Sequence, residues 1–140
     1  LFNDDGIDYL TLAPGEMVTM VHLPAASKSK TASSYTKLRI RDSIDFPLAG
    51  VAVRVTQENG KVTALDAAVT GTNSTPIRVT GCDAFVGLEF DEEQGQKFAK
   101  LVQKQTSPVQ TTTTKPQYRR RAVTAMSKTL TQNLLQALSA

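Results

Sequence analysis

The sequence predicts an α+β fold, with an antiparallel sheet of about three to four strands and about three helices packed on one face. Two observations lead to this class. β-rich apolar runs separated by turn residues fill the first part of the chain, and helical spacing of apolar residues begins only after residue 81. At 140 residues the chain has the length of about one domain. We therefore expect residues 1–140 to form a single domain, with its α+β core in residues 34–140.

Residues 1–33 are expected to hold one strand and a mobile connection. The strand is predicted at residues 17–23, a β-branched apolar run between a Pro-Gly turn and Pro24. The small polar residues that follow, AASKSKTASS, predict the mobile connection. The chain starts with neither Met nor a basic or apolar leader, so we expect a domain excised from the C-terminal part of a longer protein.

A second strand is predicted at residues 35–41, where side chains alternate with period 2. One face would be basic and the other largely apolar, with Leu38 and Ile40 toward the core. The basic face would carry Tyr35, Lys37, Arg39 and Arg41, and the other Thr36, Leu38 and Ile40.

The clearest unit of the sequence is an antiparallel hairpin around Asn59-Gly60. This pair suits the positive φ angles of a type I′ turn, and β-rich apolar runs flank it. Val51, Val53 and Val55 share one face and Arg54 lies on the other, which predicts one buried side. Residues 76–79 either add a further strand or only connect.

Helical spacing then replaces the strand pattern. Residues 82–90 and 91–105 are predicted helices, and the acids at 91–93 suit the start of the second one. A Thr-rich linker follows, and Pro116 suits the first turn of a closing helix. In that helix one apolar stripe is expected to pack on the sheet: Tyr118, Ala122, Met126, Leu130, Leu134 and Leu138.

The charges divide the chain into an acidic body and a basic arm. Residues 94–140 contain eight of the sixteen Lys and Arg side chains and none of the thirteen acids. Such an arm can bind nucleic acid, a membrane surface or an acidic partner. A membrane role is disfavoured because no apolar run approaches the roughly 18 residues of a spanning helix. Nucleic acid is disfavoured because the few aromatic residues do not interleave with the cations.

The sequence YRRR at residues 118–121 concentrates the charge of this arm. Three consecutive guanidiniums point around most of a helix and have no acid nearby in sequence. Three interpretations remain open: docking on carboxylates of a partner or of this chain, which we favour; a solvated face; and nucleic-acid binding.

No catalytic or metal-binding constellation is predicted. His22 and Cys82 are the only residues of their types and lie far apart in sequence, so Cys82 is read as a structural thiol. A single cysteine fits a reducing cytoplasm. The carboxylates Asp42 and Asp45, and those at 91–93, are read as caps and a solvated helix start.

Four sequence blocks, in order, resemble the C-terminal domain of the flavin-carrying medium subunit of molybdenum hydroxylases. They are GEMVTMVHLP, YTKLRIRDSIDFPLAGVAV, ALDAAVTGTNSTPIRV and YRRRAVTAMSKTL. This family includes carbon monoxide dehydrogenase, xanthine dehydrogenase and 4-hydroxybenzoyl-CoA reductase. The opening LFNDDGIDYLTLAPGE and the block SIDFPLAGVA are most similar to the 4-hydroxybenzoyl-CoA reductase branch.

The resemblance implies cofactors and partners. FAD would be held mostly by an upstream domain of the same subunit, and molybdopterin and [2Fe–2S] centres by partner subunits of a cytoplasmic oxidoreductase complex. This chain would cover the flavin and support assembly without catalysing a reaction alone. Without its neighbours the domain is a candidate for self-association. The alternative hypothesis is a stand-alone interaction module whose basic C-terminal arm binds an acidic partner.

Two cofactor-binding residues follow from the resemblance. The family's lysine near the flavin falls on Lys37, and Arg41 and Asp45 keep the spacing of the accompanying pattern. The family's apolar flavin contact falls on Val18, where some members have Leu. The alternatives are an exposed strand lysine for Lys37 and ordinary core packing for Val18.

Overall fold

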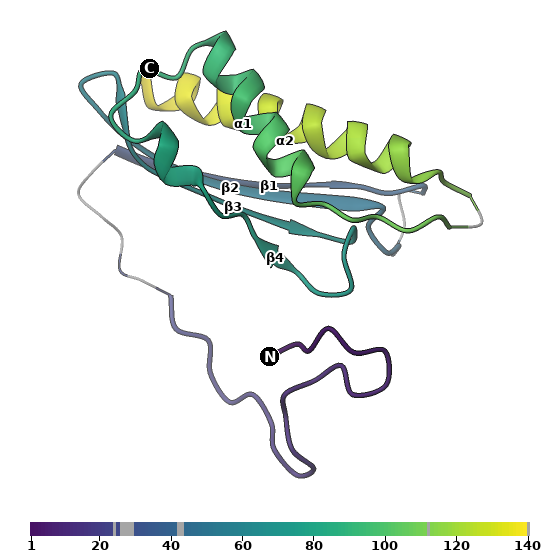
Figure 1. Cartoon of the computed structure of the whole chain (residues 1–140). Coiled ribbons are helices and arrows are strands. Elements are labelled where there is room, and N and C mark those ends of the chain that lie inside the picture. Colours follow the sequence, from purple (N-terminus) through teal and green to yellow (C-terminus); the bar gives the residue numbers. More distant parts are fainter. Residues whose placement is uncertain (24, 26–29, 42–43, 112, 140) are drawn as a thin grey trace.

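A computed structural model describes residues 1–23, 25, 30–41, 44–111 and 113–139. A four-stranded sheet carries two α-helices on one face (Figure 1). The strands are β1 (Lys30–Leu38), β2 (Ala49–Glu58), β3 (Lys61–Thr70) and β4 (Ile77–Arg78), and the helices are α1 (Glu92–Lys104) and α2 (Pro116–Ser139). A one-turn 3₁₀ helix, Cys82–Phe85, lies between β4 and α1. The predicted α+β class is confirmed.

The sheet is antiparallel with the order β1-β2-β3-β4, so every neighbour in space is a neighbour in sequence. The hairpin between β2 and β3 turns at Asn59 and Gly60, whose φ angles of 51° and 78° are those that a type I′ turn requires. A β-bulge between Thr56 and Gln57 shifts the register of this hairpin by one residue. Residues 77–78 pair with β3 and therefore add the fourth strand.

The core lies between the sheet and the helices. Alternate side chains of β2 point into it, with Val51, Val53 and Val55 all buried, as predicted. The rings of Phe85, Phe90 and Phe98 pack against one another with centroids 5.6–6.0 Å apart. This aromatic cluster packs the 3₁₀ helix, which contains Phe85, against α1, which contains Phe98.

Both helices begin where the sequence predicted. Asp91 is the N-cap of α1, and its side chain accepts a hydrogen bond of 2.8 Å from the Gln94 amide. Glu92 reaches across to α2, where Lys128 and Gln132 donate to its two carboxylate oxygens. The acids at 91–93 therefore cap and charge a helix start, as expected, and Glu92 also joins the two helices.

The helix count is two, and the expectation of about three was wrong. Residues 82–90 form only the 3₁₀ turn and a loop. Gly81 and Gly87 both have a φ of 83°, which breaks the helical path on each side of the turn.

The predicted strand at residues 17–23 is also absent. These residues are exposed and hydrogen-bond to no strand in the described part of the chain. Without backbone hydrogen bonds to a neighbouring strand, the segment does not form a β-strand. In the predicted mobile connection, residues 26–29 lie outside the described residues, and residues 30–34 belong to β1. The core sheet therefore starts earlier than expected.

The buried stripe of α2 lies one residue away from the predicted one. Its buried members are Arg119, Val123, Ser127, Thr131, Leu134 and Leu135. Of the predicted stripe, Leu134 is buried, and Met126, Leu130 and Leu138 are partly buried and pack against the core, whereas Tyr118 is 51% exposed. Ser127 and Thr131 tolerate burial because their hydroxyls donate to the carbonyls of Val123 and Ser127, one turn back.

Candidate functional site: the open face of the sheet

One face of the sheet carries no helix, and we call it the open face (Figure 1). The register places Tyr35, Ala52, Ala68 and Arg78 side by side across all four strands. A shallow groove of about 540 Å³ lies here, and its floor includes Ser33, Ala52 and Ala68. Because small side chains line its centre, another surface or a flat ligand can approach the strands closely.

An ion-paired triad forms one wall of this groove. Arg54 and Arg78 approach the two carboxylate oxygens of Asp66 to 2.6 and 2.7 Å, from the strands on either side of β3. Partial burial alone would raise the pKa of Asp66, but the hydrogen bonds from Arg78 and Arg54 outweigh it and hold that pKa below its ordinary value. The triad therefore carries a net positive charge.

The predicted site residue Lys37 lies at the end of β1, next to Tyr35 on the same face. Its register partner is Gly50, where a Cβ would collide with the Tyr35 hydroxyl and the Thr70 side chain. The tyrosine therefore lies over the glycine. The Lys37 ammonium is exposed and donates a 3.3 Å hydrogen bond to the Asp45 carbonyl. Lys37 is thus an accessible cation at the edge of the open face.

The second predicted site residue, Val18, lies elsewhere. It belongs to the irregular N-terminal segment, which Figure 1 shows away from the sheet, and it is 54% exposed. The core-packing alternative for Val18 is therefore wrong for this chain. The structure does not bring Val18 and Lys37 into one site.

The strand that carries Lys37 starts and ends earlier in the chain than predicted. β1 ends at Leu38, so Arg39 and Arg41 lie beyond it, and Ile40 is 62% exposed instead of facing the core. Asp45 accepts hydrogen bonds of 3.3 Å from the Ile40 and Arg41 amides, which supports its predicted capping role. Asp42 lies outside the described residues.

The three arginines at 119–121 have different environments. Arg119 is buried and donates to the carbonyls of Leu48 and Val109 at 2.8 Å and to that of Gly71. Arg120 and Arg121 are exposed. Arg119 thus docks within the chain, but its acceptors are backbone carbonyls and not the predicted carboxylates.

Other chemistry finds little support in the described residues. They contain no group of three or more His, Cys, Asp or Glu that could hold a metal ion, and no helix long and apolar enough to cross a membrane. Cys82 is buried, as a structural thiol should be, and burial raises its pKa. His22 lies exposed in the N-terminal segment.

The geometry defines a class of protein: an antiparallel sheet with helices on one face and none on the other. Comparison with known families supplies the particular member of this class. Residues 33–134 match the CO dehydrogenase flavoprotein C-terminal domain, and the chain belongs to this family.

Solved structures agree with the assignment. Carbon monoxide dehydrogenase from Hydrogenophaga pseudoflava, in a form that lacks the Mo-pyranopterin moiety of the molybdenum cofactor, matches with a TM-score of 0.74 and 26% identity. That match covers 83% of this chain and 40% of the other. Reconstituted CO dehydrogenase from Oligotropha carboxidovorans gives 0.71 at 21% identity, covering 76% and 37%. Quinoline 2-oxidoreductase from Pseudomonas putida 86 gives 0.72 at 16%, covering 79% and 39%. The chain thus spans about two fifths of these proteins.

Sequence reasoning missed the triad of Arg54, Asp66 and Arg78. Without the bulge, an Asn59-Gly60 hairpin would place Arg54 opposite Leu65; with the bulge its partner is Asp66. The sequence does show opposite charges in neighbouring strands, at Arg54 and Asp66. It does not show the strand register that places these two residues opposite each other.

Proposed function

We propose that the open face of this domain covers the flavin of an FAD-carrying subunit in a molybdenum hydroxylase-type oxidoreductase. The family match carries the proposal. In it, an upstream domain of the same subunit holds most of the FAD, and molybdopterin and [2Fe–2S] centres belong to partner subunits of a cytoplasmic complex. The domain supports the assembly of these parts. Within the family we favour the 4-hydroxybenzoyl-CoA reductase branch.

The residues on the open face fit a covering role for a planar group. Ala52 and Ala68 project little beyond the backbone, so a ring can approach the strands closely there. Tyr35 supplies a flat aromatic surface beside them. The open face would thus shield one side of the ring from water, while phosphate recognition would remain with the upstream domain.

Lys37 supplies the electrostatic part of the proposal. FAD bound there would accept and release electrons, and its reduced form is the more electron-rich. A fixed positive charge beside the ring stabilises added electron density by Coulomb attraction. Lys37 is suited to this because its ammonium is exposed and donates to a carbonyl, and no carboxylate among the described residues forms an ion pair with it.

The test is the substitution Lys37→Met in the full-length subunit, with the flavin potential as the readout. Removing the cation should lower the two-electron potential by about 30 mV, which corresponds to about 1.4 kcal/mol. A spectroelectrochemical titration of the flavin absorbance measures it. The matched control is Lys61→Met, which removes an exposed lysine at the β2–β3 turn.

Two results would contradict the proposal at different levels. A well-folded full-length subunit with no flavin absorbance would remove the flavoprotein assignment itself. Equal potential shifts in the Lys37 and Lys61 variants would leave the flavoprotein intact but remove Lys37 from the neighbourhood of the ring.

A further inference from the structure

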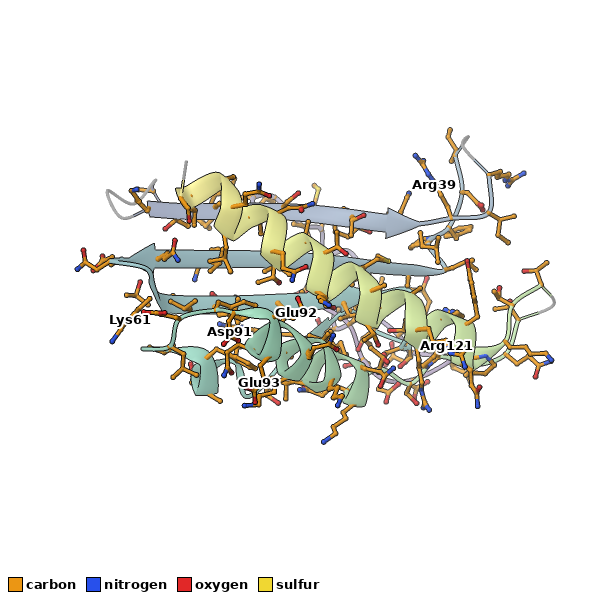
Figure 2. The ribbon with its side chains drawn as sticks, turned by 90° about the horizontal axis from the view of Figure 1, so that it is seen from above. Arg39, Lys61, Asp91, Glu92, Glu93 and Arg121 are labelled. Carbon is orange, nitrogen blue, oxygen red and sulfur yellow. The ribbon has the colours of Figure 1, made fainter. Side chains whose placement is uncertain are left out.

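Cations from two distant parts of the chain meet at one end of the molecule, which we call the basic end. It comprises Arg39 and Arg41, just after β1, and Lys115, Arg120 and Arg121, around the start of α2. Figure 2 shows Arg39 and Arg121 at this end and Lys61 at the opposite one. Arg39 and Lys115 line the same groove, of about 540 Å³. The fold thus gathers charges that the sequence separates by more than seventy residues.

These cations have little compensation from acids. In the part of the chain that the structure describes, Asp45 is the only carboxylate within ion-pair distance of the basic end, 3.7 Å from Arg41. The first turn of α2 contains no acid, so the positive end of the helix dipole adds to the field. The acids at 91–93 lie at the start of α1, away from Arg39 and Arg121 (Figure 2). A negatively charged partner would relieve the repulsion among these cations.

The groove between the cations is partly apolar. Ile40 and Tyr118 line it and are both more than half exposed, and the partly buried Leu48 lines it as well. Thr113 and Thr114 add hydroxyl groups that can donate hydrogen bonds. A small inorganic anion would leave the apolar surface in water, whereas a peptide with carboxylates around an apolar side chain would cover both parts.

We propose that the basic end is a docking site for an acidic segment of a partner protein, with an apolar side chain of that segment seated in the groove. The carboxylates would pair with Arg39 and Lys115 on its two sides, and the apolar side chain would contact Ile40 and Tyr118. The site lies beyond the open face, and its existence does not depend on a bound flavin.

A synthetic peptide tests the site on the full chain. The probe is a fluorescein-labelled peptide of about twelve residues, rich in Asp and Glu around a central Leu-Phe pair, and the readout is fluorescence anisotropy. Binding should weaken as salt rises from about 50 to 300 mM, because the Debye length shortens. The double variant Arg39→Gln with Lys115→Gln should bind about tenfold more weakly.

A matched control removes the same charge elsewhere. Lys61→Gln with Lys97→Gln lowers the net charge equally but leaves the groove intact, and should change affinity by less than about twofold. A second pair, Arg120→Gln with Arg121→Gln, tests the other side of the basic end and should also weaken binding. Urea midpoints equal to the wild type confirm that all variants fold.

Three outcomes would overturn the proposal. The first is an equal loss of affinity in the control and in the Arg39 and Lys115 variant, which would indicate attraction by net charge alone. The second is unchanged affinity when Ser replaces the Leu-Phe pair of the peptide, which would exclude the apolar contact. The third is tighter binding of a duplex DNA of matched charge, which would assign the basic end to nucleic acid.

Discussion

Arg119 shows how differently three identical neighbours can behave. It is the only buried member of the three arginines, and its guanidinium satisfies carbonyls from three separate connections. A Cβ at Gly71, one of those connections, would meet the Pro47 carbonyl, and Gly71 has a φ of 77°. The backbone around the guanidinium is therefore closely packed and specifically shaped.

Arg119→Ala is expected to destabilise the domain by about 3 kcal/mol, because it leaves buried carbonyls without donors and removes a packed side chain. Arg120→Ala, on the exposed side of the same helix, should cost less than about 0.5 kcal/mol. Urea unfolding followed by circular dichroism measures both. Similar midpoints for the two variants would contradict the structural role of Arg119.

The two predicted site residues, Lys37 and Val18, differ in how much of their environment the sequence could predict. The period-2 pattern placed Lys37 on an exposed strand face because alternation is a local property. The position of Val18 depends instead on which sheet its segment joins, and nothing within that segment specifies the partner. Its predicted contact with the flavin stays a prediction.

At the scale of elements, one bulge decides the chemistry of the open face. Val62 and Leu65 are both buried although they are three residues apart, because the register shifts within the hairpin. That shift brings Asp66 beside Arg54 and Arg78. The turn and the valine face of β2 were predictable from local chemistry, whereas the bulge depends on how the two strands pair.

The triad makes stability depend on pH. The pKa of Asp66 is lowered in the folded state, so its stabilising contribution is present above its unfolded pKa of about 3.9 and is lost as pH falls through the lower folded value. The difference in urea midpoint between the wild type and Asp66→Asn should thus be largest near pH 6 and shrink below about pH 4. In a background with Arg54→Gln and Arg78→Gln, the same substitution should show no such trend. A difference that is constant with pH in both backgrounds would contradict the role of the triad.

The helices were predicted better in position than in orientation. Capping chemistry at Asp91 and Pro116 is local, and both starts were correct. The predicted stripe of α2 packs against the core in part, but the most buried face lies one residue further along and contains Arg119, Ser127 and Thr131, which an apolar pattern does not reveal. These polar residues are buried because the backbone supplies their partners.

At the scale of the whole molecule, the N-terminal segment and the core are nearly independent. Residues 1–23 form their own small bridge between Phe2 and Leu10 and keep most side chains exposed. A hydrogen bond from Ser74 to Asp4 links this segment to the body. The family match at 33–134 likewise begins after it.

Removing residues 1–23 is therefore expected to change the free energy of unfolding by less than about 1 kcal/mol, since the hydrogen bond from Ser74 to Asp4 is exposed and contributes little. The comparison is a chain that lacks residues 132–140, which removes the buried Leu134 and Leu135 and should prevent cooperative unfolding. Thermal unfolding by calorimetry distinguishes the two. A loss of several kcal/mol in the first variant would show that the N-terminal segment belongs to the core.

The buried guanidinium of Arg119 also constrains the order of events during synthesis. Its acceptors Leu48 and Gly71 leave the ribosome well before it, separated from it by 71 and 48 residues. Until α2 emerges, the strands of the sheet can pair. The connections at Leu48 and Gly71, however, lack the guanidinium of Arg119 as hydrogen-bond donor, and the side chains of Val51, Val53 and Val55 are not covered by α2. A nascent chain that stops before Pro116 should therefore be open to proteases at these connections, and native protection should appear only when α2 docks.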